Sequence, residues 1–130
     1  MTTPDPAVER LLPLTPASFH ILLALAGGER HGYGIMQEVE ALTQGQMRLG
    51  PGTLYRSIKQ LLAADMIEES DERPDPALDD ERRHYYRLTS FGQRVACAEA
   101  ERLARLVALA HQRHLLADNR ATFWVKGGLA

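Results

Sequence analysis

Apolar residues recur at helical spacing in one stretch near the middle of the chain. They stand at i, i+4, i+7 and i+8, which places their side chains on one face of an α-helix. These residues are Leu54, Ile58, Leu61 and Leu62. Gly50 and Pro51 come just before them, in the order of a helix N-cap followed by a proline at the first helical position. The pattern predicts an amphipathic helix that starts at Pro51 and ends before Asp65.

Two shorter helices are predicted before this one. Thr15 and Pro16 are typical of a helix start, and Gly27 with Gly28 is typical of a helix end. After a turn at residues 29–32, a second helix is predicted from about Tyr33 to residues 43–45, with apolar residues at i, i+4 and i+7. These are Ile35, Val39 and Leu42. Three helices joined by short turns form the helix-turn-helix pattern.

Two strands follow the third helix. Residues 67–70 and 83–88 are strand candidates, and Tyr85 and Tyr86 alternate in the second, so one of them is expected in the core. The interval of residues 71–81 is rich in Asp, Glu and Pro, which predicts a solvated loop. Asp65 is expected to adopt a left-handed backbone conformation just past the third helix. Two strands around a long tip after a helix-turn-helix form a wing.

A long final helix is predicted from the N-cap Thr89 to about Leu116. Its apolar side is made of Phe91, Val95, Leu103, Leu106, Val107 and Ala110. A helix of this length exceeds what a three-helix core with a hairpin can cover, so a second copy of the chain is the expected partner of the surplus stripe. The predicted fold is therefore mainly α with a small β-hairpin: a winged helix-turn-helix plus a long C-terminal dimerisation helix.

These elements divide the chain into four parts. Residues 1–13 are predicted to be a flexible N-terminal arm, in which Val8, Leu11 and Leu12 could dock as a short turn. Residues 14–88 are predicted to form the winged helix-turn-helix DNA-binding domain, and residues 89–116 the dimerisation helix. Residues 117–130 form a tail with Phe123, Trp124 and Val125, to which no role is assigned.

The charge is unevenly distributed. The chain has 130 residues and a formal net charge of -2, which taken globally argues against nucleic-acid binding. Residues 41–64 and 82–98, however, contain cations and no Asp or Glu, whereas residues 65–81 hold nine of the seventeen acids. A phosphate responds to the potential within about 8–10 Å, so the local pattern matters more than the total.

The polar side of the helix from Pro51 carries residue types that contact phosphates and base edges. The predicted DNA-binding residues are Tyr33, Thr53, Tyr55, Arg56, Ser57, Lys59, Gln60, Arg82 and Arg83. Each has a structural alternative. Arg56 and Lys59 are equally typical of a solvated helix face, Tyr33 and Tyr55 of packing aromatics, and Thr53 of a helix cap. Arg82 and Arg83 can pair with the acids at residues 79–81 instead of DNA.

The sequence resembles the PadR family of transcriptional regulators in four places. These are residues 14–16 (Leu-Thr-Pro), residues 31–35 (His-Gly-Tyr-Gly-Ile), residues 52–55 (Gly-Thr-Leu-Tyr) and residues 82–89 (Arg-Arg-His-Tyr-Tyr-Arg-Leu-Thr). The resemblance implies a winged-helix homodimer, joined through its last helix, that binds operator DNA and represses. Arg56 stands where many relatives have Pro, Asp65 stands where they have Gly, and the predicted wing tip is acidic.

Other chemistry has little support in the sequence. No activated nucleophile, paired-carboxylate cleft or cofactor motif is present, so neither an enzyme nor a cofactor is predicted. His111 and His114 lack a third metal ligand, and Cys97 is expected to be a small buried residue. Lone Cys97, the short apolar runs and an N-terminus without signal-peptide features predict a cytoplasmic protein that does not enter a membrane. Two hypotheses stay open: a small apolar effector between the last helices, and a winged-helix protein-interaction module that does not bind DNA.

Overall fold

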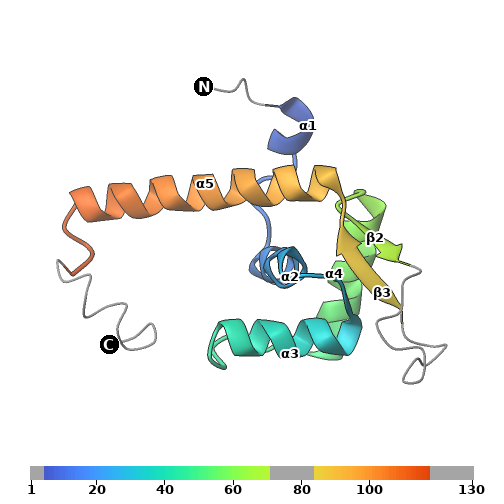
Figure 1. The fold of residues 1–130 in the computed structure, drawn as a ribbon. Helices are drawn as coiled ribbons and strands as arrows, with labels where there is room; N and C mark the ends of the chain where they lie inside the picture. Colours follow the sequence, from blue (N-terminus) through green and yellow to red (C-terminus); the bar gives the residue numbers. More distant parts are fainter. Residues whose placement is uncertain (1–4, 71–83, 118–130) are drawn as a thin grey trace. The chain divides into compact units, whose positions relative to one another are not determined.

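The computed structural model describes residues 5–70 and 84–117 (Figure 1). The elements in chain order are α1 (Pro6–Glu9), α2 (Pro16–Ala26), β1 (Arg30–His31), α3 (Gly32–Leu42), α4 (Pro51–Ala63), β2 (Ile67–Ser70), β3 (Tyr85–Leu88) and α5 (Ser90–Gln112). The chain divides into a unit of residues Met1–Glu99 and a second unit of residues Ala100–Ala130. The mainly helical winged-helix fold expected from the sequence is confirmed.

The helix starts follow the local signals in the sequence. The Thr15 hydroxyl accepts a hydrogen bond from the Ser18 amide at 3.1 Å, and Pro16 begins α2. Pro51 begins α4 after Gly50, as the pattern predicted. The cap of α3 is His31, whose Nδ1 accepts a hydrogen bond from the Gly34 amide at 3.0 Å. The Thr15 and His31 side chains each satisfy an amide that has no partner within its helix.

The sheet has three antiparallel strands in the order β1-β3-β2. β3 lies in the middle. Its Tyr86 is paired with Arg30 of β1 on one side and with Glu69 of β2 on the other. The turn predicted for residues 29–32 is wrong at Arg30 and His31, which form β1. A strand of two residues has no periodicity of its own, since it exists only because its backbone pairs with β3 far along the chain.

The core of the first unit is centred on α2, which packs against α3, α4 and β3. Fifteen residues form it: Val8, Ile21, Leu22, Ala24, Leu25, Ile35, Val39, Leu49, Leu54, Ile58, Leu61, Met66, Ile67, Tyr86 and Val95. Val8 belongs to α1, and Leu11 and Leu12 pack against the same core. The docking anticipated for Val8, Leu11 and Leu12 is therefore confirmed, and burial of these apolar side chains holds residues 5–12 on the domain instead of leaving them as a flexible arm.

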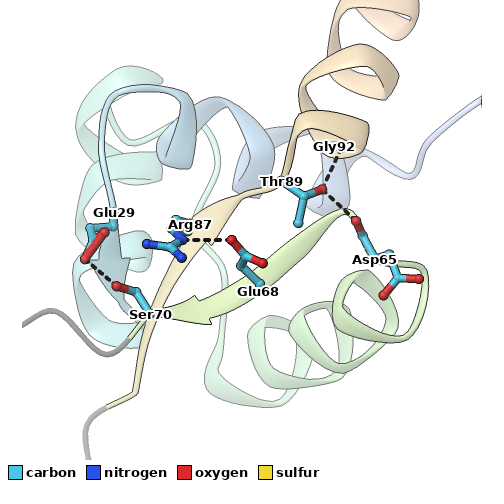
Figure 2. A network of polar contacts seen from close by, with 7 residues as sticks. All are labelled: Glu29, Asp65, Glu68, Ser70, Arg87, Thr89 and Gly92. Carbon is cyan, nitrogen blue, oxygen red and sulfur yellow. Dashed lines mark hydrogen bonds and ion pairs between the residues drawn. The ribbon is translucent and has the colours of Figure 1, made fainter.

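A compact joint connects the end of α4 to the start of α5 (Figure 2). Asp65 has a φ of 60°, the left-handed conformation predicted for this position. The Thr89 hydroxyl donates to the Asp65 carbonyl at 2.6 Å and accepts from the Gly92 amide at 2.9 Å. The Thr89 amide donates to the Met66 carbonyl at 3.1 Å. Thr89 is thus both the predicted cap of α5 and the link that holds α5 to the chain leaving α4.

We expect Thr89→Ala to lower the free energy of unfolding by about 1–2 kcal/mol, since the variant loses a helix cap and leaves the Asp65 carbonyl without its hydroxyl donor. Thr89→Ser keeps the hydroxyl and is the matched control, expected within about 0.5 kcal/mol of the parent protein. Urea denaturation followed by circular dichroism measures both. Equal stabilities for the two variants would show that the hydroxyl bonds contribute nothing.

The second unit is described up to Ala117 and contains the rest of α5. Its large apolar side chains are exposed: Leu106, Val107, Leu109, Leu115 and Leu116. No helix among the described residues is both long enough and apolar enough to span a bilayer.

Candidate nucleic-acid interface

α4 divides cleanly into a buried face and an exposed face. Leu54, Ile58 and Leu61 are buried in the core of the first unit. The exposed side chains among the predicted contacts are Thr53, Tyr55, Arg56, Lys59 and Gln60. No Asp or Glu occurs in α4, and its hydroxyl, amide and cationic groups are the kinds that contact phosphates and base edges.

The two cations of this face have few partners within the structure. The Arg56 guanidinium donates to the Thr53 hydroxyl at 3.5 Å, which is a long hydrogen bond. Among residues 5–70 and 84–117, neither Arg56 nor Lys59 forms an ion pair. Their charges therefore remain available to an anion approaching α4.

Ser57 does not belong to this face. It was predicted as a DNA contact, but its side chain is only 6% exposed. Ser57 lies one turn from Leu54 and Leu61 along the helix, on the edge of the apolar stripe, and packing against the core covers it. The predicted contact at Ser57 is wrong.

Tyr33 lies at the start of α3, the other helix of the helix-turn-helix, where a contact with DNA is proposed. It is the second residue of α3 and is 57% exposed, which rules out the alternative that it fills the core. The N-terminus of a helix carries a partial positive charge and free amides, so it attracts phosphate groups. Tyr33 thus occupies a favourable position for a backbone contact.

Tyr55 has one side in the solvent and one against α3. It is 50% exposed, yet its hydroxyl and ring edge lie directly over Gly32, the first residue of α3. Tyr86 is buried in β3 nearby. Burial raises the pKa of the Tyr86 hydroxyl above its ordinary value, and the charges of Glu69 and of an ionised Tyr55 act in the same direction. Of the two alternating tyrosines, one of which was expected in the core, Tyr86 is the buried one.

The described part of the wing is rich in paired charges. Arg87 and Glu68 form an ion pair across β3 and β2 at 2.8 Å, and His84 contacts Glu69 at 2.9 Å. The Ser70 hydroxyl donates to the Glu29 carboxylate at 2.9 Å, which connects β2 to the segment before β1 (Figure 2). Arg82 and Arg83, predicted to hold flanking DNA backbone, lie outside the described residues.

The predicted dimerisation stripe of α5 is split by the structure. Val95 is fully buried in the core of the first unit, so its assignment to a dimer interface is wrong. Phe91 is half-buried and packs against the same core. Leu106 and Val107 are 49% and 55% exposed. Leu103 and Ala110 are half-buried. The stripe that remains open to a partner begins after Glu99.

Two smaller predictions concern possible ligand chemistry. Cys97 is exposed, so the expectation that it is a small buried residue is wrong. The Gln93 side-chain amide contacts its sulfur at 3.8 Å. Within the described ranges, no group of three or more His, Cys, Asp or Glu side chains is arranged to hold a metal ion.

One feature of the site was missed by sequence reasoning. Gly32 was interpreted only as a helix boundary, but it is also the surface against which Tyr55 packs. The contact joins two consecutive helices through residues that lie far apart along the chain, one in the first turn of α3 and the other in α4. Local periodicity contains no signal for it.

An exposed, cationic second helix of a helix-turn-helix, followed by a β-hairpin, is the architecture of winged-helix transcriptional regulators. The sequence matches the family described as the transcriptional regulator PadR-like family over residues 21–98. The chain therefore belongs to the PadR-like family of transcriptional regulators, whose members are regulators and not enzymes.

One curated relative is an uncharacterised 37.1 kDa protein in a transposon of Streptomyces fradiae. It is 33% identical over 90 residues, which cover 69% of this chain and 24% of that protein. The chain thus spans about a quarter of the length of the curated relative it matches.

Solved structures share the fold. A transcriptional regulator from Clostridium thermocellum is 19% identical with a TM-score of 0.63, over 85% of this chain and 97% of that one. A PadR family regulator from hypervirulent Clostridium difficile is 19% identical with a TM-score of 0.62, over 75% and 97%. A complex structure of RosR from H. salinarum is 26% identical with a TM-score of 0.58, over 92% and 99%.

Proposed function

We propose that this chain is a homodimeric repressor that binds a pseudo-palindromic operator in double-stranded DNA and responds to a small effector. The observation that carries the DNA-binding part is the exposed, acid-free face of α4, on which Arg56 and Lys59 have no ion pair among the described residues. A surface of this kind in the second helix of a helix-turn-helix fits the major groove.

Each side chain of the face has a distinct role in this proposal. Arg56 and Lys59 bind phosphates, and Gln60 reads a base edge through its amide. Thr53 lies at the start of α4 and supports Arg56 through its hydroxyl. Tyr33 meets the backbone at the N-terminus of α3. Arg82 and Arg83 are proposed to hold the backbone on either side of the central contacts.

The second unit is proposed to join two copies. Leu106 and Val107 are large exposed apolar side chains one turn or less apart, with Leu103 and Ala110 flanking them at helical spacing. Packing this stripe against its symmetry mate removes it from water. In such a dimer the two copies of α4 enter successive major grooves about 34–36 Å apart.

We expect Val107→Glu to weaken the dimer, because the variant places a carboxylate in the middle of the proposed interface. Ala108→Glu adds the same charge one residue further along, at an exposed position that points away from the stripe, and is expected to leave the dimer intact. Sedimentation velocity across a concentration series compares the two. Dimers of equal strength in both variants would place the interface elsewhere.

Selection of bound fragments from a random DNA pool tests the proposal as a whole, because it gives the half-site, its spacing and its symmetry. Binding of the selected site is then measured over a range of salt. A DNA-binding regulator loses affinity steeply as salt rises. A plot of log affinity against log salt concentration falls with a slope of about 0.9 for each phosphate contact. Failure to enrich any fragment would favour the alternative of a protein-interaction module, with which the acidic net charge is consistent.

The effector is proposed to be a small apolar molecule that binds between the paired copies of α5. Its entry would change the spacing of the two α4 helices and thereby the affinity for the operator. Candidate ligands that leave both the operator affinity and the melting temperature unchanged would contradict this part alone.

A further inference from the structure

A side chain at Gly32 would displace the end of the Tyr55 ring. A methyl carbon added to it would lie 2.9 Å from Cζ and 3.0 Å from Cε1 of Tyr55, and closer still to the Tyr55 hydroxyl oxygen. Separations below about 3.0 Å force one group to move, and here the group that has to move is the end of the half-exposed Tyr55 side chain. The end of the Tyr55 ring therefore rests on the backbone of Gly32. The contact joins the first turn of α3 to the first two turns of α4.

The surface on which the ring rests is itself held in place. Directly before Gly32, Arg30 and His31 form β1 and pair with Tyr86 and Tyr85 of β3. His31 also packs edge-on against the Tyr85 ring, with 5.4 Å between the ring centroids. The Nδ1 atom of His31 also accepts a hydrogen bond from the Gly34 amide. Gly32 is thus fixed by the sheet on one side and by the helix cap on the other.

The orientation of Tyr55 does not favour a phosphate contact. Although half of its surface is exposed, its hydroxyl is the part that lies against Gly32. We infer that Tyr55 is a positioning residue: its ring, packed on Gly32, sets the separation between the N-termini of α3 and α4. This inference rests on the proposed DNA binding, since those two helix ends carry Tyr33 and Thr53 toward the duplex.

The separation matters because a rigid binding surface must match the spacing of its target. Phosphate contacts fix the register of a protein on DNA, and supporting contacts must hold such groups to within about 0.5 Å. Displacing α3 from α4 would separate contacts that have to be made together. Specific binding should suffer more than non-specific binding, which depends mainly on charge.

A double-mutant cycle tests the inference. Gly32→Ala inserts a methyl group under the ring and is expected to lower the affinity for the selected operator about tenfold. Tyr55→Leu removes the ring end, so adding Gly32→Ala to it should cost no more than about twofold. Tyr55→Phe keeps the ring without the hydroxyl and is expected to stay within about twofold of the parent protein.

Gly34→Ala is the matched control for the methyl insertion. A methyl carbon there would lie 3.5 Å from the nearest atom, an ordinary contact, in the same helix turn. Affinity for random-sequence DNA is measured for every variant, together with the melting temperature. We expect Gly34→Ala to bind the operator like the parent protein and Gly32→Ala to keep its affinity for random DNA.

Three outcomes would overturn the inference while leaving DNA binding intact. The first is an additive effect of Gly32→Ala and Tyr55→Leu. The second is a loss in Tyr55→Phe as large as that in Tyr55→Leu, which would assign the hydroxyl to DNA. The third, decisive if Gly32→Ala does not fold, is unchanged operator affinity in Tyr55→Leu. Absence of operator binding by the parent protein would instead overturn the proposed function.

Discussion

Replacing Arg56 and Lys59 together with alanine is expected to lower the affinity for operator DNA by about 100-fold or more at moderate salt. Both side chains are exposed on α4, and neither has an ion pair among the described residues that would have to break before DNA binds. In the proposed dimer, the double variant removes four phosphate contacts. The plot of log affinity against log salt should become less steep by about 3.6, at about 0.9 for each contact.

The matched control is Arg10→Ala with Arg105→Ala. This control also removes two positive charges per protomer, but from exposed positions at the C-cap of α1 and in the second unit. Electrophoretic mobility shift or fluorescence anisotropy at several salt concentrations measures both double variants. The control should keep most of its affinity and salt slope. Equal losses in the two double variants would mean that only the net charge matters, and that α4 is not the contacting surface.

The helices were predictable from the sequence because their signals are local. Periodicity and a proline at the first position define α2 and α4 without reference to the rest of the chain, and α2 has a capping hydroxyl as well. Asp65 likewise reveals its left-handed conformation by its position after an apolar run. β1 was missed because it owes its structure to the backbone of β3, far along the chain. The docking of Val8, Leu11 and Leu12 was anticipated, but the sequence left a flexible arm as the main prediction, because the hold on α1 comes from the distant core around Val8.

The candidate site shows the same division. The exposure of Arg56 and Lys59 follows from their angle to the apolar stripe, whereas Ser57 lies at the edge of the stripe, where only the packing decides. Along α5 apolar residues stand on both sides of Glu99 and Arg102, and their spacing alone does not say which of them pack on the domain's own core. The structure places Val95 inside that core and leaves Val107 exposed. The Tyr55–Gly32 contact joins separate elements, and no local pattern indicates it.

The joint between α4 and α5 is expected to be the least tolerant point of the first unit. A methyl group added to Gly92 would lie 2.8 Å from the carbonyl carbon and 3.1 Å from Cα of Met66, and closer still to the Met66 carbonyl oxygen. These are backbone atoms, so no side chain can rotate away to make space. The start of α5 would have to move, and the bonds of Thr89 to Asp65 and Met66 would be stretched with it.

We therefore expect Gly92→Ala to lower the free energy of unfolding by about 3 kcal/mol or more, a large share of the roughly 5–15 kcal/mol that stabilises a domain. Gly52→Ala is the matched control, because a methyl group there meets no atom within 4 Å. Because Gly52 lies in the first turn of α4, Gly52→Ala should raise the free energy of unfolding by up to about 1 kcal/mol through helix propensity. Urea denaturation of both variants gives the comparison. An unchanged midpoint for Gly92→Ala would show that α5 is not held tightly against Met66 at the end of α4.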